Sequence, residues 1–139
     1  MTQDQLSNQL VTSEYREVNR NQIHIINIDD LTRQGVDEYI KIVEDEILAK
    51  EDTLLLSIHN YAKLGGMITP YFLGSAKKLA DKNTRTDMYG RVGMVTTMDI
   101  FRILINPLMK IFARENNKVE IKFFTSLDEA IQWVSEYEG

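Results

Sequence analysis

The sequence contains no cysteine. Without thiols the chain cannot form a disulfide, a thiolate metal site or a cysteine nucleophile, so three common kinds of chemistry are excluded. Other residues that carry chemistry are few, with two histidines, His24 and His59, and one tryptophan. The two histidines are far apart in sequence, and neither has a second ligand at metal-binding spacing. We therefore expect neither a metal centre nor a cofactor.

Long apolar runs are missing as well. The longest, residues 100–112, is interrupted by polar residues and by Pro107, and none reaches the roughly 18 residues that a membrane-spanning helix needs. Residues 1–5 have neither the basic nor the apolar segment of a signal peptide. We therefore predict a cytoplasmic protein without a transmembrane segment. The net charge of −5 argues against nucleic acid as a partner.

The length of 139 residues corresponds to one domain, and 43% apolar with 27% charged residues is typical of a folded globular protein. Residues 1–13 are mostly polar and have no periodicity, which predicts a flexible N-terminal tail. Residues 14–139 contain neither a repeat nor a linker, so we expect them to form a single domain.

Short β-branched runs alternate with amphipathic segments along this domain. Residues 14–18 and 22–28, separated by the turn residues 19–21, predict a β-hairpin. Three further strands are expected at residues 53–58, 91–95 and 119–124, and four helices are expected to begin near residues 32, 70, 97 and 127. This alternation predicts an α/β fold with a mixed, largely parallel five-stranded sheet and an antiparallel N-terminal hairpin.

Two of these helices have clear start signals. Thr69 followed by Pro70 has the pattern of an N-cap and a first helical residue. Ser126 and Glu129 have the spacing of a capping box, in which the serine hydroxyl accepts a hydrogen bond from the Glu129 N–H.

The order of elements, the glycine-containing turn after residues 53–58, and the ending F-x-S-L-D-E-A-x-x-W at residues 124–133 resemble a known family. This family is the SpoIIAA-like branch of the STAS superfamily, small bacterial proteins also described as STAS/SEC14-like. The resemblance covers residues 14–137 and implies an α/β layer around a mixed sheet. It also implies a non-enzymatic protein-interaction or regulatory module. The similarity to SEC14-like proteins implies an alternative function, a binder or sensor of a small apolar or amphipathic ligand.

In STAS anti-anti-sigma factors, a kinase phosphorylates a serine in the turn between the third strand and the second helix. The corresponding residues 61–69 contain Gly65 and Gly66 but no serine, so the phosphoacceptor role is not carried over. Thr69 is the nearest hydroxyl, and its expected role is to cap the helix. Whether Thr69 or another hydroxyl is phosphorylated stays open.

Polar residues follow the predicted central strands. Because ligands tend to bind outside the carboxyl ends of parallel strands, we expect a small-molecule site there, walled by His59, Tyr61, Thr69 and Thr97. His59 would act as a hydrogen-bonding or pH-sensitive group, and Asp99 is the one carboxylate placed to approach it. The alternative is that these side chains only cap helices and satisfy loop backbone. His24, inside a strand, is expected to be structural.

The third predicted helix is unusually apolar, with its polar residues in one narrow stripe. Pro107 should kink it or split it in two. We expect its outer side to form a twofold self-association surface, with Phe101, Ile105, Met109 and Phe112 as the contact residues. The alternatives are an apolar ligand pocket and a deeply buried helix.

Charge is unevenly distributed, with a net of −7 over residues 1–62 and +6 over residues 63–122. Lys77, Lys78, Lys82 and Arg85 cluster at the end of the second predicted helix. They either complement the helix dipole or meet an anionic partner, such as an acidic protein face or a lipid headgroup.

Neither a catalytic grouping nor a cofactor motif is visible, so we do not expect an enzyme. The partner is predicted to be a second copy or another protein, with a small apolar ligand as the alternative.

Overall fold

Five strands form one sheet in the computed structural model, which describes residues 9–64, 68–83, 85–98, 103, 105–113 and 117–138. The spatial order equals the chain order: β1 (Val11–Val18), β2 (Asn21–Ile28), β3 (Leu54–Asn60), β4 (Tyr89–Val95) and β5 (Lys118–Phe124). The β1–β2 pair is antiparallel and the other three pairs are parallel. The predicted mixed sheet with an antiparallel N-terminal hairpin is confirmed.

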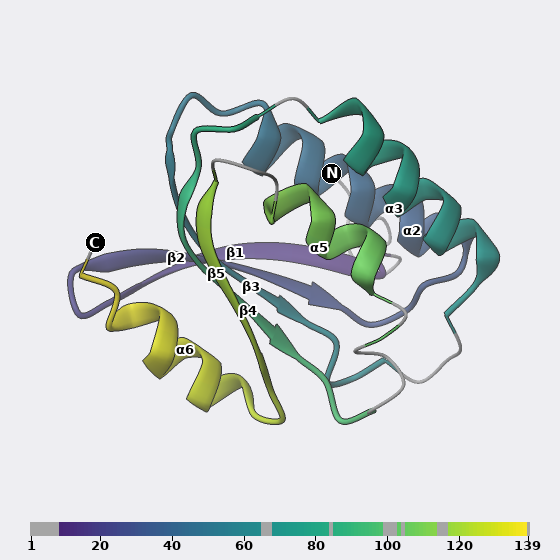
Figure 1. Cartoon of the computed structure of the whole chain (residues 1–139). Coiled ribbons are helices and arrows are strands. Elements are labelled where there is room, and N and C mark those ends of the chain that lie inside the picture. The colour runs from purple at the N-terminus through teal and green to yellow at the C-terminus, as the bar shows by residue number, and fades with distance from the viewer. Residues whose placement is uncertain are drawn as a thin grey trace.

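Helices cover both faces of the sheet (Figure 1). Three of them, α2 (Arg33–Ile42), α3 (Pro70–Lys82) and α5 (Asn106–Phe112), lie on one face, and α6 (Leu127–Ser135) lies alone on the other. The start signals of α3 and α6 are confirmed: Thr69 accepts from the Phe72 N–H, and Ser126 accepts from the Glu129 N–H. Among the described helices, none is long and apolar enough to cross a membrane.

Alternation along the strands divides the buried side chains into two cores. On β3, Leu55 packs in the larger core under α2, α3 and α5, whereas Leu56 and Ile58 pack in the smaller core under α6. Ser57 and His59 share the face of Leu55. Polar side chains of β3 are therefore buried on the side that three helices cover.

The first strand begins at Val11, three residues before the predicted start at residue 14. The Glu38 carboxylate on α2 accepts hydrogen bonds from the Leu10 and Val11 N–H groups, at 2.9 and 3.0 Å. Residues 11–13, which belong to the predicted tail, pair with β2 up to Ile28, and the bonds to Glu38 hold the start of the strand. The hairpin turn is also tighter than predicted. It consists of Asn19 and Arg20, both at positive φ (53° and 71°), which is the backbone of a two-residue hairpin loop.

The helix predicted to begin near residue 32 changes its hydrogen bonding after Ile42. After α2, the π-helical segment η1 (Val43–Leu48) follows, and the Ala49 N–H donates to the Glu44 carbonyl five residues back, at 2.8 Å. In the third predicted helix, the described α5 begins at Asn106 with Pro107 in its first turn. Residues 99–102 and 104 of that prediction lie outside the described residues.

Candidate functional site

Two of the four residues expected to wall a ligand site at the carboxyl ends of the strands are buried inside the protein. His59 is fully buried on β3, and Tyr61 just after β3 is 2% exposed. The Tyr39 hydroxyl, on α2, hydrogen-bonds to both His59 Nδ1 and the Tyr61 hydroxyl. Tyr39 therefore joins His59 and Tyr61 from above the sheet, and Phe72 stacks on the Tyr39 ring.

Burial sets the protonation states of this network. It lowers the pKa of His59 to about 3, and it raises the pKa values of Tyr39 and Tyr61 above their ordinary range. At neutral pH all three groups are therefore uncharged. Within the described part of the chain, His59 Nε2 and Ser57 Oγ are buried without a hydrogen-bond partner.

The other two predicted wall residues do not complete a site. The Thr69 hydroxyl accepts from the Phe72 N–H at 3.2 Å and donates to the Leu31 carbonyl at 3.4 Å. Thr97 is exposed, and Asp99 lies outside the described residues. The structure thus brings His59 and Tyr61 together through Tyr39 and gives Thr69 a capping role. The predicted ligand site itself stays a prediction.

Two of the four residues predicted to form a contact surface on the third helix are buried in the protein core. Ile105 and Phe112 are fully buried in the larger core, so their expected position on the outer side is wrong. They face inward because α5 packs against α3, and the Phe112 ring packs edge-on against the ring of His59 on β3, with centroids 5.5 Å apart. Met109 is partly buried, and Phe101 lies outside the described residues. Instead, Ile103 is 69% exposed.

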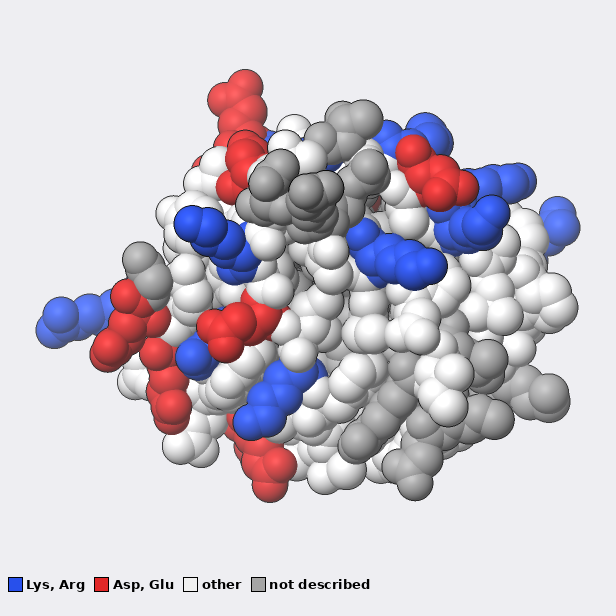
Figure 2. Space-filling model, viewed as in Figure 1, with Lys and Arg blue, Asp and Glu red and all other residues white. Residues whose placement is uncertain are grey.

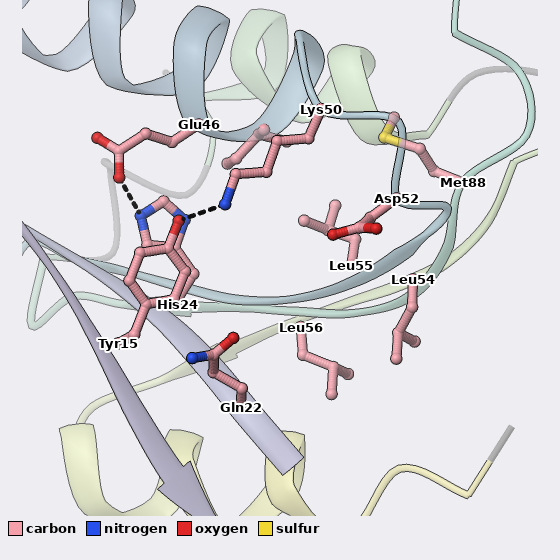
Figure 3. A pocket seen from close by; sticks show the side chains of 11 residues that line it. Tyr15, Gln22, His24, Glu46, Lys50, Asp52, Leu54, Leu55, Leu56 and Met88 are labelled. Atoms are coloured by element: carbon pink, nitrogen blue, oxygen red, sulfur yellow. Dashed lines mark hydrogen bonds and ion pairs between the residues drawn. The ribbon is translucent and has the colours of Figure 1, made fainter.

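A cleft of about 100 Å³ lies at the opposite, amino end of the parallel strands (Figure 3). We call it the amino-end cleft. Its polar lining residues come from the hairpin, from η1 and from the segment between η1 and β3: Tyr15, Gln22, His24, Glu46, Lys50 and Asp52. Apolar side chains complete the wall: Ile47, Leu54, Leu55, Leu56 and Met88.

His24 is held on one side of this cleft by two residues. Ser13 Oγ lies 2.7 Å from His24 Nε2 and 2.7 Å from Glu46 Oε1, and Glu46 Oε1 lies 3.3 Å from His24 Nε2. Because a carboxylate only accepts hydrogen bonds, Ser13 donates its single proton to Glu46 and accepts from the His24 Nε2–H. Neutral His24 therefore carries its proton on Nε2 and has a lone pair on Nδ1. Figure 3 shows that second nitrogen on the side of Lys50.

An aromatic ring and a cation cover the other side of His24. The Tyr15 ring stacks on the imidazole with centroids 4.6 Å apart, and the Lys50 ammonium donates to the Tyr15 hydroxyl at 2.9 Å. Burial lowers the pKa of His24, and the charge of Glu46 opposes this shift. His24 is therefore mainly neutral at pH 7 and presents an acceptor to the cleft.

Arg85 fixes the backbone that carries the cleft's charged rim. Its guanidinium donates to the carbonyls of Ile47, Lys50 and Asp52, and pairs with the Asp87 carboxylate at 3.2 Å. Figure 2 shows several basic side chains at the upper right, where α3 lies in Figure 1, and others spread over the rest of this face. Of the four residues in the predicted basic cluster, Arg85 thus has a structural role, while Lys77, Lys78 and Lys82 are exposed.

This arrangement differs from a catalytic triad. In a triad the nucleophile and the acid contact opposite nitrogens of the histidine, whereas here Ser13 and Glu46 both contact Nε2. The cleft has the composition of a polar binding site. Within the described ranges, His, Asp and Glu side chains form no group of three that could hold a metal ion.

Sequence reasoning missed Ser13, Tyr15, Glu46 and Lys50. Ser13 belongs to the predicted tail, and Glu46 lies within a predicted regular helix without a role of its own. One signal was present: on a hairpin with a two-residue turn, Tyr15 and His24 are directly opposite each other. A turn of that length would have predicted this pair.

The sequence matches no family model and no curated protein. The structure is similar to that of an uncharacterized protein from the DUF3478 family with a SpoIIAA-like fold, from Shewanella loihica PV-4 (TM-score 0.61, 16% identity, 89% of this chain and 93% of that chain). It is also similar to an anti-sigma factor antagonist from Mycobacterium paratuberculosis (TM-score 0.50, 10% identity, 91% of this chain and 95% of that chain). At these identities the likeness shows the fold, which is SpoIIAA-like.

Proposed function

We propose that this SpoIIAA-like protein is a non-enzymatic regulatory module that acts by binding another protein. The observation that carries this proposal is the closed Tyr39–His59–Tyr61 network. It keeps His59 and Tyr61, two of the four residues predicted to wall a ligand site at the carboxyl ends of the strands, inside the fold. At 0% and 2% exposure, neither side chain is accessible to a substrate at the surface.

The name of one structural relative also supports a protein partner, since it is described as an anti-sigma factor antagonist. In this chain the Thr69 hydroxyl is engaged in capping α3, so we do not propose a phosphorylation switch at residues 61–69. Ile103 is the most exposed large apolar side chain among the described residues and is our choice for the partner surface.

An affinity experiment tests this proposal. The tagged full-length protein is incubated with an extract of its own cells, and retained proteins are quantified by mass spectrometry. Ile103→Asp should reduce the amount of a stoichiometric partner about tenfold, because a charge would be desolvated in the interface. Gln132→Asp, at an exposed position on α6, is the matched control and should retain the partner.

Two results would contradict the proposal. One is that the wild-type protein retains no stoichiometric partner, neither a different protein nor a second copy of itself. The other is turnover of a metabolite by the purified protein alone.

A further inference from the structure

A second depression adjoins the amino-end cleft. This outer hollow has a volume of about 430 Å³ and shares Gln22, Asp52, Leu54 and Leu56 with the cleft. Its remaining lining residues include Arg20 from the hairpin turn and Tyr89 from the start of β4. The two depressions are therefore continuous around the amino end of β3. The outer one is within the size range of small-molecule sites.

Exposed apolar side chains concentrate around these depressions. Among the described residues, four large hydrophobic side chains are exposed, and three of them line the cleft or the hollow: Tyr15 (44%), Leu54 (43%) and Tyr89 (37%). Single exposed hydrophobics are ordinary, but a group of them around a depression indicates a binding surface. A ligand for this surface needs an apolar part.

The inner cleft adds polar groups of both signs. The Lys50 ammonium and the Tyr15 hydroxyl are donors, and Tyr15 has its own proton available because it accepts from Lys50. The Asp52 carboxylate and the His24 Nδ1 lone pair are acceptors. A simple anion would meet Asp52, and a simple cation would meet Lys50. A head group with one charge of each sign satisfies both.

We propose that the amino-end cleft and the outer hollow together bind a small amphipathic zwitterion. Its ammonium and carboxylate groups occupy the inner cleft, and its apolar body lies over Leu54 and Tyr89. An apolar α-amino acid is the smallest molecule of this class. Arg85, through its bonds to the carbonyls of Lys50 and Asp52, holds the two opposite charges in place.

NMR spectra of the full-length protein, recorded during titration with three probes, test this proposal. L-phenylalanine has both head charges, 3-phenylpropionate lacks the ammonium, and phenethylamine lacks the carboxylate. We expect L-phenylalanine to shift the signals of Tyr15, His24, Leu54 and Tyr89 with a Kd of about 1 mM or lower, and each half-headed probe to bind at least about fivefold more weakly.

Two lysine variants provide the matched control. Lys50→Met should weaken L-phenylalanine binding about tenfold, because it removes the cation that faces the carboxylate. Lys78→Met, an exposed lysine on α3, should leave binding unchanged. Both residues are exposed, and an unchanged amide spectrum outside the cleft establishes that each variant is folded.

The proposal is overturned if the three probes bind equally, or if none shifts these four residues at about 20 mM. It is also overturned if the shifts occur at His59 and Tyr61 instead. Shifts of the same four residues by a protein partner, with no response to the probes, would assign this surface to protein binding.

Discussion

Replacing Gly90 with alanine is expected to lower the free energy of unfolding by about 3–5 kcal/mol. Gly90 lies in β4 at a φ of +141°, a conformation that a residue with a side chain rarely adopts. A Cβ atom there would lie 1.9 Å from the carbonyl oxygen of Leu55. Leu55 is its neighbour in the parallel β3–β4 pair, so relief would require the two central strands to separate. Urea-induced unfolding measures the loss.

Gly74→Ala is the matched control. Gly74 is inside α3, and a Cβ atom there would meet nothing within 4 Å. Alanine should therefore raise the free energy of unfolding by about 0.5–1 kcal/mol, because glycine is the poorer helix former. If Gly90→Ala were as stable as the wild type, the β3–β4 pairing described here would be wrong.

Replacing Tyr39 with phenylalanine should lower the free energy of unfolding by about 2–4 kcal/mol. The change removes one hydroxyl and almost no volume. It leaves buried His59 Nδ1 without its hydrogen-bond partner and takes one partner from Tyr61. Leaving a buried polar atom unpaired costs more than an ordinary hydrogen bond contributes.

Tyr71→Phe is the control for Tyr39→Phe. The Tyr71 hydroxyl also hydrogen-bonds to a side chain of α2, that of Asp37, but this contact is exposed. Water replaces the lost partner there, so the free energy of unfolding should change by less than about 1 kcal/mol. Equal losses for the two variants, measured by urea-induced unfolding, would show that the Tyr39 hydroxyl is accessible to water.

The fold could be predicted from the sequence because its signals are local. The β-branched run at residues 22–28, Thr69 and Pro70 at the start of α3, and the capping box at Ser126 each determine an element within a few residues. The order of these elements then restricts the topology to few choices.

The site could not be predicted in the same way because it depends on which face each side chain takes. His59 has the sequence context of a loop-edge residue, but the alternation along β3 places it under α2. Glu46 contacts Ser13, 33 residues earlier in the chain, and lies in a π-helical segment that apolar periodicity does not reveal. The inward position of Ile105 and Phe112 could not be predicted either, because an apolar helix gives no indication of its outer side.

Protonation of His59 links this closed network to stability. The pKa of His59 is about 3 in the folded protein, against an ordinary value of 6.5. Between these pH values the unfolded chain binds a proton that the folded chain excludes. The stabilisation is therefore complete above pH 6.5 and decreases as the pH falls toward 3, by about 1.4 kcal/mol per pH unit. The lowered pKa of His24 acts in the same direction.

A pH titration of both imidazoles by NMR tests the central claim most directly: that His59 is enclosed in the Tyr39–His59–Tyr61 network and that His24 borders a polar cleft at the amino end of the strands. For as long as the protein stays folded below pH 7, the His59 signals should keep their neutral positions. The His24 signals should titrate below the ordinary value of 6.5. A folded protein in which His59 titrates near 6.5, while His24 does not respond, would contradict this account.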